Sequence, residues 1–591
     1  MAFIVGKRQN GKTYYYLAES ARVDGKPRIV SQRYLGSAEE IAARLSEGGP
    51  GEPDRSRHLA FGDVAAVWEM LRRLRVAEVV DEVVGARRSD AGASVGTYIA
   101  LATLNRVVDP CSKLAFSDWW DTTACDRWLA LSPGALDHRR FWDAMDAIGE
   151  DDLKEIERRI VTGMVETFAV DLSGLVLDMT NFATWIDSAN SRAPIAERGH
   201  SEQKRSDLRI CGLGLVVSVD GGIPLVSHAY PGNKPDVTQF TAMVTELVTR
   251  FATLMADGDG ADGADGADGA DGADGADGET ATGATGRLTL VYDAGQNSDD
   301  NYELLDGSPL HFVGSLPPSD HPELLAVPRG RYEVVDHDRF PGLVAFETTK
   351  VVFGKERRLV VCHSNGLHDK QSRGFAQTLT KTQRQLAELE ARLSRGRCRR
   401  SREKVEAEIA AICAPRWVSR VMATTLVGED PAELRLSFAI DEDARDALET
   451  ELFGKRILFS DKAPDEAPTA QIVAEYRSQE TVEGDFRQMK DPKVVSFSPM
   501  FHFTEQKIRV HVLYCVLALM VARLMVREAD QAGIHLSVRA LLSSLAGIEE
   551  TVLLYQGERG RPRARRMITE KDATQSRLYE LFGLEVYAPK R

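Results

Sequence analysis

Two aspartates end apolar runs of the kind that form buried strands. Asp178 follows the run 174–177, and Asp293 follows the run 288–292. A strand holds an acid at its tip rigidly, and the carboxylate then faces the open edge of a sheet, where ligands bind. A single Asp after a strand is more often a turn or helix-cap residue. The pair therefore indicates chemistry only if a third carboxylate joins it.

A helix predicted over 471–489 supplies a third carboxylate. Tyr476, Glu483 and Lys490 are spaced by seven residues. Seven residues are about two helical turns, so the three side chains project from one stripe. A phenol, a carboxylate and an ammonium are not the residues of a core stripe. The alternative is that Glu483 and Lys490 are simply solvated.

The spacing on this helix resembles a known signature. Tyr476, two residues, Gln479, three residues, Glu483, six residues and Lys490 are similar to Tyr-x2-Arg-x3-Glu-x6-Lys, the signature of one large group of DDE transposases of bacterial insertion sequences. Further segments similar to one branch of that group are 14–17, 198–201, 204–208, 230–233, 293–295 and 503–511. The resemblance covers nearly the whole chain, and the order of these motifs is more specific than any one of them.

The resemblance implies a catalytic core of ribonuclease H-like fold. Asp178, Asp293 and Glu483 would be its first, second and third catalytic acids and its metal ligands. Two Mg²⁺ or Mn²⁺ ions about 3.5 to 4 Å apart need hard oxygen ligands, which carboxylates provide. One ion would activate water or a DNA 3'-hydroxyl, and the other would stabilise the leaving oxygen.

The resemblance also assigns contacts to DNA. Tyr476 and Lys490 would position phosphates near the cleaved end. Gln479 stands where the signature has Arg, and the nearby Arg487 is an imperfect substitute because it lies on another helix face. A basic loop after the first acid could hold DNA beside the metals, although a solvated turn is an equally open interpretation. Its residues are Arg198, His200, Lys204 and Arg205.

These residues must be positioned by an α/β core with added domains. Alternating aromatic and polar residues predict a β-meander within 1–50, and a period of three and four predicts an all-helical domain within 55–170. Strand-like runs with helical segments predict an α/β core. The predicted parts are the meander 1–50, the helical domain 55–170, the catalytic core 171–315 and 466–530, an insertion domain 316–465 and a C-terminal region 531–591. The meander and the helical domain are expected to contact the ends of the transposable element.

The net charge of −15 does not exclude a nucleic-acid partner. An Ala-Asp-Gly tract, 256–279, carries eight Asp and one Glu, and the rest of the chain has a charge of −6. The tract has a period of three and no strand-forming residue, so we expect a disordered surface loop rather than calcium binding. Arginines cluster at 395–402 and 559–566, and the first cluster and Trp417 are further candidates for DNA contact.

Cysteine usage and hydropathy indicate a cytoplasmic protein. The seven cysteines form no Cys-x-x-Cys pair, so neither a disulfide framework nor a structural zinc site is indicated. The N-terminus has no long apolar region or cleavage site. The apolar run 510–524 is too short to span a membrane and predicts a buried helix. We expect a bacterial cytoplasmic location, associated with the nucleoid.

The sequence thus predicts a DDE transposase that binds the terminal inverted repeats of its element, cleaves double-stranded DNA and transfers the ends to a target. A homodimer on DNA is expected from the resemblance. Two alternatives stay open. One is a metal-dependent nuclease of the same fold, and the other is a decayed or domesticated copy that only binds DNA, which Gln479 and the Ala-Asp-Gly tract favour.

Overall fold

The computed structural model describes most of the chain. The described residues are 2–9, 11–23, 26–46, 52–85, 92–132, 134–201, 205–256, 288–395, 399–555 and 563–590. The Ala-Asp-Gly tract, predicted as a loop, lies outside them apart from Ala256. The chain divides into two compact units. Unit 1 comprises 1–66, 117–130 and 539–591, and unit 2 comprises 67–116 and 131–538.

Unit 1 begins with a three-stranded antiparallel sheet, which forms where the sequence predicts a β-meander. Its order is β1-β2-β3, with β1 (Ala2–Gln9), β2 (Lys12–Val23) and β3 (Lys26–Ser37), and α1 (Ala38–Ser46) follows. The ring of Tyr34 contacts Tyr14 and Tyr16 across the strands, with centroids 6.0 and 5.4 Å apart. Cross-strand aromatic pairs of this kind stabilise a sheet that has little core of its own.

A second sheet in unit 1 joins segments from the two ends of the sequence. Its order is β17-β16-β4, with β17 (Arg563–Ile568), β16 (Glu549–Tyr555) and β4 (Arg55–Ala60). The carboxylate of Glu550 is buried on β16 and pairs with Arg127 at 2.5 Å and Arg566 at 2.6 Å. The sequence predicts only helices from 55 onward, but β4 has no apolar alternation, and its partner strand lies far along the chain. Three further helices belong wholly or mainly to unit 1: α5 (Phe116–Trp120), α18 (Val538–Ala546) and α19 (Ala573–Leu581).

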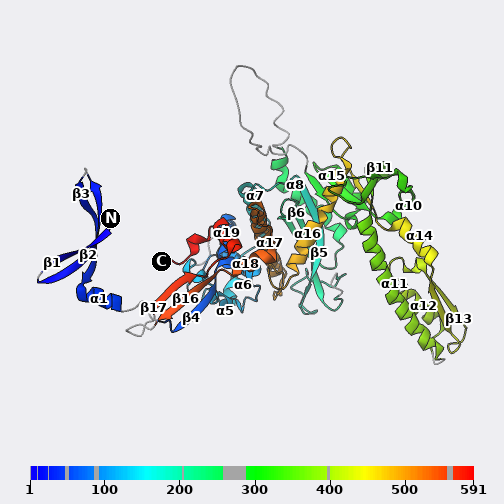
Figure 1. The fold of residues 1–591 in the computed structure, drawn as a ribbon. Helices are drawn as coiled ribbons and strands as arrows, with labels where there is room; N and C mark the ends of the chain where they lie inside the picture. Colours follow the sequence, from blue (N-terminus) through cyan, green and yellow to red (C-terminus); the bar gives the residue numbers. More distant parts are fainter. Residues whose placement is uncertain are drawn as a thin grey trace, which may run out of the picture. The chain divides into compact units, whose positions relative to one another are not determined.

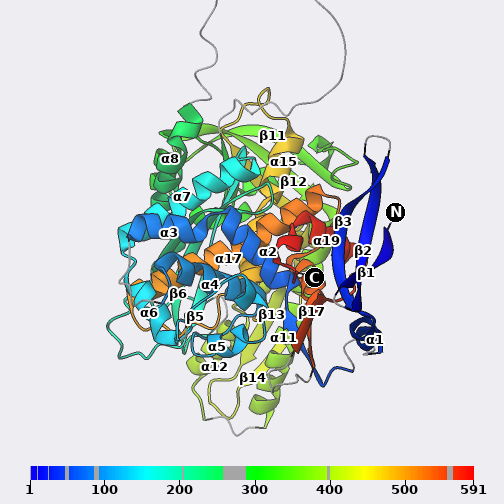
Figure 2. The same cartoon turned by 90° about the vertical axis from the view of Figure 1, so that its left-hand side faces the viewer.

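Unit 2 contains a group of packed helices. They are α2 (Gly62–Arg73), which begins in unit 1, α3 (Val76–Val84), α4 (Val95–Val108), α6 (His138–Asp146), α7 (Glu150–Phe168) and α17 (Glu505–Gln531). Figure 2 shows α3, α4 and α17 beside one another, and both pairs formed with α4 are in contact. By length and composition α17 could cross a membrane, but 89% of its apolar window is buried inside the protein. The prediction of a buried helix is therefore confirmed.

A nine-stranded mixed sheet forms the centre of unit 2. Its order is β10-β11-β12-β15-β9-β8-β5-β6-β7. The strands are β5 (Gly174–Thr184), β6 (Arg209–Ser218), β7 (Pro224–Pro231), β8 (Thr289–Val291), β9 (His311–Leu316), β10 (Glu333–Val334), β11 (Leu343–Val352), β12 (Lys355–Ser364) and β15 (Lys455–Ser460). Strands β5, β6 and β7 are antiparallel neighbours, and β8 and β9 continue the sheet parallel to β5. The chain thus has the mixed α/β structure that the sequence predicts.

Helices cover both faces of this sheet. Helix α8 (Phe240–Ala256) lies against the face that carries Met179 and Gly214, where a Cβ at position 214 would fall 2.3 Å from the sulfur of Met243. Helix α9 (Asp299–Asp306) contacts α8. Helices α15 (Thr469–Arg477) and α16 (Gln479–Met489) lie on the opposite face, and Figure 1 shows α16 beside β5.

The region predicted as an insertion domain, 316–465, does not stand apart from the core throughout. Strands β10, β11, β12 and β15 belong to the central sheet, because β15 pairs with β9 through Ile457 and Leu316. The part outside the sheet consists of α11 (Asn365–Ser394), α12 (Arg402–Ile412), α13 (Val418–Val421), β13 (Met422–Val427), β14 (Arg435–Ile440) and α14 (Glu442–Leu452), and the short α10 (Pro322–Leu325) precedes β10. The sequence could not show that these strands belong to the central sheet, because a hairpin that extends a sheet has the same local pattern as one in a separate domain.

The candidate DNA contacts of this region are largely engaged within the protein. Trp417 packs against the rings of Phe375 and Phe453, with centroids 6.3 and 5.2 Å away. Arg400 pairs with Glu408 at 2.7 Å, and Arg402 donates to the carbonyls of Gly428 and Leu426. Residues 396–398 of the arginine cluster lie outside the described residues.

Candidate active site

Asp178 lies in the middle of β5 rather than at its tip, so the position predicted from the apolar run was wrong. Strand β5 continues to Thr184 because it pairs with β6 along its whole length, with Asp178 opposite Leu215. On its other side, pairing with β8 stops at Val176 and Val291. Asp178 therefore stands two residues past the last pair, where one neighbouring strand has ended.

Asp293 occupies the matching place on β8. It too is two residues past the last pair, and β5 and β8 run parallel. Register partners of parallel strands lie side by side, and side chains two residues apart point to the same face. The register thus brings Asp178 and Asp293 to one level on one face of the sheet. Asp178 is half-buried, and Asp293 is exposed.

The carboxylate of Asp293 is turned toward the helical layer. Asp293 is the N-cap residue of the short helix 294–296, but its side chain makes no capping hydrogen bond. Its Oδ1 instead accepts hydrogen bonds from the hydroxyl of Ser315 at 3.1 Å and from that of Tyr476 at 3.2 Å. The helix-cap alternative that the sequence left open does not describe this side chain.

The predicted single helix is two helices in the structure. Helix α15 ends at Arg477 and α16 begins at Gln479, while Ser478 between them keeps a helical backbone with φ −63° and ψ −11°. Tyr476 contacts Asp293, and the Nζ of Lys490 donates to the Thr180 hydroxyl on β5 at 2.6 Å. Thr180 is two residues from Asp178 and shares its face. The two ends of the predicted stripe therefore reach the sheet beside the two aspartates.

Glu483 lies between these two anchors on α16. The helix packs through Val482, Asp485, Phe486 and Met489, which are buried, whereas Glu483 is exposed on the flank of that face. Glu483 has no hydrogen-bond or ion-pair partner within the described ranges. In that part of the chain, no three His, Cys, Asp or Glu side chains form a group that could hold a metal ion. The register thus places Asp178 and Asp293 at one level of the sheet, and with Glu483 they form no such group.

Two charged residues that the sequence did not indicate support this layer. The guanidinium of Arg456, on β15, lies 5.0 Å from the ring centroid of Tyr476. Asp485 is fully buried and pairs with Arg523 of α17, and burial raises the pKa of its carboxyl to about 7. Burial also raises the pKa of Tyr476 to about 12, so its hydroxyl is protonated at neutral pH. Only the tertiary structure places Arg456 here, because β15 precedes α15 in sequence without any shared motif.

The other residues predicted to contact DNA differ in their exposure and in their partners within the protein. Gln479 is half-buried and Arg487 is exposed. The exposed Arg198 donates to the Ser188 hydroxyl at 3.3 Å. His200 is exposed, and its carbonyl accepts from the Asn181 side chain on β5 at 3.2 Å. Lys204 lies outside the described residues.

Arg205 is partly neutralised. It forms a bidentate pair with Asp207 at 2.7 and 2.8 Å, and this pair lowers the pKa of the Asp207 carboxyl to about 2. The guanidinium also lies 5.2 Å from the ring centroid of Trp185, whose relative exposure is 67%. Trp185 belongs to none of the sequence motifs, although an exposed indole beside a basic loop suits base stacking.

Comparisons with known proteins add a distant likeness. No protein-family model matches the chain, and no curated protein matches it. Among solved structures, the chain is similar to a piggyBac transposase in the cryo-EM structure of its synaptic complex with hairpin DNA. The identity is 10%, the match covers 84% of this chain and 82% of that chain, and the TM-score is 0.36. A TM-score of this size does not establish a shared fold.

Proposed function

We propose that the chain is a DDE transposase that binds the ends of its own element, cleaves DNA with divalent metal ions and joins the ends to a target. The observation that carries the proposal is the matched position of Asp178 and Asp293, level on one sheet face beneath the helix of Glu483. The strand order supports a ribonuclease H-like core, since three antiparallel strands are followed by two strands parallel to the first.

The donor set fits divalent metal ions in residue type. Mg²⁺ and Mn²⁺ prefer carboxylate oxygens, and Asp178, Asp293 and Glu483 would hold the ions. The Oδ2 of Asp293 has no partner in the described part of the chain, which leaves an oxygen for coordination. Glu483 would have to turn its exposed side chain toward the aspartates. Bound ions would supply activation of the attacking oxygen and stabilisation of the leaving oxygen.

The residues around the carboxylates would act as positioning groups. Tyr476 and Ser315 donate to one oxygen of Asp293 and fix the orientation of its carboxylate. Lys490 holds a compact positive charge beside Thr180, where it could bind a phosphate of the cleaved strand. Arg456 lies beside Tyr476 and could supply the guanidinium that the signature has at the position of Gln479.

The proposed DNA contacts outside the core are the N-terminal meander and the loop of Arg198, His200, Lys204 and Arg205. The meander exposes Tyr34 at 49%, together with Arg8, Arg28 and Arg33. Aromatic rings and arginines together suit contact with a nucleic-acid backbone. Two copies of the chain would be needed to hold two DNA ends, so we propose a homodimer on DNA.

The test is metal-dependent cleavage of a DNA fragment that carries the two flanks of the gene. We expect Asp293→Asn and Glu483→Gln to reduce cleavage on the order of 10²–10³-fold, because each removes a proposed ligand of the metal ions that would stabilise the transition state. Glu480→Gln is the matched control, since Glu480 is an exposed acid on the same helix. Full cleavage by either site variant would overturn the assignment of that residue.

Two further readouts separate the alternatives. Strand transfer into a second DNA distinguishes a transposase from a nuclease of the same fold. Specific binding of the element's ends without cleavage by the wild-type chain would support the decayed copy, which Gln479 favours.

A further inference from the structure

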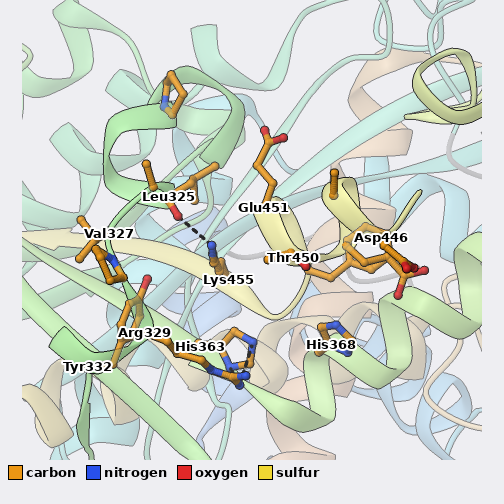
Figure 3. A pocket seen from close by; sticks show the side chains of 16 residues that line it. Leu325, Val327, Arg329, Tyr332, His363, His368, Asp446, Thr450, Glu451 and Lys455 are labelled. Carbon is orange, nitrogen blue, oxygen red and sulfur yellow. Dashed lines mark hydrogen bonds between the residues drawn. The ribbon is translucent and has the colours of Figure 1, made fainter. Parts of the chain in front are cut away.

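A cavity of about 870 Å³ opens in unit 2 away from the aspartate pair. It lies among the segment after α10, the end of β12, α11 and α14, and the start of β15. Its size is within the range of cavities that take a ligand as large as a nucleotide. Figure 3 shows Arg329, Tyr332 and His363 on one side and Asp446 and Thr450 on the other.

One wall of the cavity carries two cations, of which Lys455 also interacts electrostatically with the carboxylate of Glu451. The Nη2 of Arg329 donates to Nδ1 of His363 at 3.0 Å and to the Asn365 side-chain oxygen at 3.3 Å. The Nζ of Lys455 donates to the carbonyl of Leu325 at 2.8 Å, the contact drawn in Figure 3. Neither cation forms an ion pair within the described stretches. Two such cations facing one cavity create a positive potential that favours an anion.

The imidazole on this wall lies beside the guanidinium of Arg329. Burial, Arg329, His368 and Lys455 lower the pKa of His363 to about 4. Burial likewise lowers the pKa of Lys455, and the nearby Glu451 opposes part of this shift. At neutral pH, His363 is therefore a neutral acceptor that holds the guanidinium of Arg329 in place. Gly454 permits this packing, because a Cβ there would lie 2.8 Å from Nε2 of His363.

A hydrogen-bond donor on the same wall lacks a partner. The hydroxyl oxygen of Tyr332 is buried and makes no hydrogen bond to any residue that the structure describes. Burial raises the pKa of Tyr332 to about 12, so the hydroxyl is protonated and can donate at neutral pH. A buried hydroxyl without a partner is rare and indicates a missing water, ion or ligand.

The opposite wall is acidic. Glu449 and Glu451 are already paired, with Arg445 at 3.0 Å and Arg420 at 2.6 Å. The exposed Asp446 has no such partner in the part of the chain that the structure describes. A ligand that fills the cavity must therefore present an anionic group to one wall and hydrogen-bond donors to the other. A simple anion fits the first wall only.

We propose that this cavity binds a nucleotide through its phosphate, with Arg329 and Lys455 on the phosphate and the acidic wall facing the donors of the sugar and base. A guanidinium and an ammonium are the usual phosphate contacts of proteins. The nucleotide is either free or part of a DNA strand, and the experiment separates these sources. The site is distinct from the aspartate pair, and its occupation requires no cleavage.

The test is calorimetric titration of the full-length chain, without divalent metal, with deoxyadenosine monophosphate and with deoxyadenosine. We expect the monophosphate to bind at least about tenfold more tightly, because charge-assisted hydrogen bonds to the phosphate contribute that much. Arg329→Gln and Lys455→Gln should each weaken monophosphate binding about tenfold. Arg384→Gln is the control, since Arg384 is 83% exposed on α11 and does not line the cavity.

A single-stranded oligonucleotide is the second probe. If the monophosphate does not bind but both cavity variants weaken oligonucleotide binding about tenfold and Arg384→Gln does not, the ligand is a nucleotide of a strand. Equal binding of monophosphate and deoxyadenosine, or unchanged binding of both probes by the cavity variants, would overturn the proposal. Thermal unfolding of each variant checks its fold, and if one cavity variant does not fold, the folded one decides the outcome.

Discussion

Side chains of like charge lie together in two places in unit 2, one near solvent and one buried. On the sheet face, Asp178 and Asp293 lie level with each other near solvent. In the helical part, Arg106, Lys113, His502 and His511 lie together, none more than 6% exposed. Arg106 donates to the carbonyls of Pro499 and Cys111, but its Nε and Nη1, like Lys113 Nζ and His502 Nδ1, have no hydrogen-bond partner among the described residues.

The two groups differ in how the repulsion between their like charges is reduced. Burial lowers the pKa of Lys113 to about 7 and that of His502 to about 3, and it holds the pKa of His511 well below its usual range. The basic groups of the buried cluster therefore lose protons more readily, because a charge without a counterion has a high free energy in the interior. The aspartates keep contact with water and can be relieved by cations from solution. Solvent access thus separates a structural cluster from a candidate reactive one.

The largest expected effect is on the sheet face. Asp178→Asn should reduce metal-dependent DNA cleavage on the order of 10²–10³-fold. The free energy of unfolding should change by less than about 0.5 kcal/mol, because the carboxylate is half-buried and solvated. Cleavage assays and urea unfolding on the same preparation check both parts. A large loss of stability would place Asp178 with the structural cluster and break the comparison.

A smaller effect is expected from the cation beside the aspartates. Lys490→Met should lower cleavage about 10- to 100-fold, as removal of an outer-shell partner typically does. Lys493→Met is the matched control, since Lys493 is an exposed lysine shortly after it. Equal activity of the two variants would show that Lys490 has no role in the reaction.

In the buried cluster, removal of a charged side chain is expected to stabilise the protein. Lys113→Met should raise the free energy of unfolding by roughly 1–2 kcal/mol at pH 7, because it removes an ammonium without a hydrogen-bond partner. The methionine can pack against Tyr514, whose ring centroid lies 4.5 Å from the ammonium. Urea unfolding measures the change. Destabilisation by the variant would indicate an unrecognised counterion at this site.

The stability difference between the wild type and Lys113→Met should also depend on pH. The pKa of Lys113 falls from 10.5 to about 7 on folding, so unfolding takes up a proton between these values. The stability of the wild type should therefore rise relative to Lys113→Met as pH increases from about 7 toward 10.5, and the advantage of the variant should shrink. A constant difference across this range would contradict a depressed pKa.

The smallest effect concerns Tyr476. Tyr476→Phe removes one of the two hydrogen bonds to Oδ1 of Asp293 and keeps the ring under Arg456. Loss of one such bond is expected to cost about 0.5–1.5 kcal/mol, so cleavage should fall about two- to tenfold. A loss as large as that of Asp178→Asn would make Tyr476 a member of the reactive group itself.

Local patterns predicted the parts of the site that depend on one segment. The apolar runs beside Asp178 and Asp293 identified neighbouring strands, and the seven-residue spacing identified a helix face. The extent of β5 was not predictable, because its pairing with β6 continues through polar residues such as Thr180 and Asn181. Sequence alone also predicted no contact for Arg456, whose approach to Tyr476 depends on the order of β15 in the sheet.

The limits of the fold prediction have a similar cause. The buried α17 was predictable from its own residues. The pairing of β4 with β16 was not, and neither was the membership of β11 and β12 in the central sheet, because both depend on partners that are distant in sequence. The buried cluster of Arg106 and Lys113 was equally invisible, since a helix pattern does not predict which polar residues face inward.

The pairing of β4 with β16 sets an order of events during synthesis. Residues 55–60 must wait for 549–554 to leave the ribosome, which takes on the order of half a minute to a minute and a half at about 5–20 residues per second. Unit 2, whose residues are all made before β16, can fold first. Throughout the wait β4 presents Arg55, Arg57 and His58, and charged edges of this kind resist pairing with other chains. We therefore expect the polarity of this strand to limit aggregation of the nascent chain.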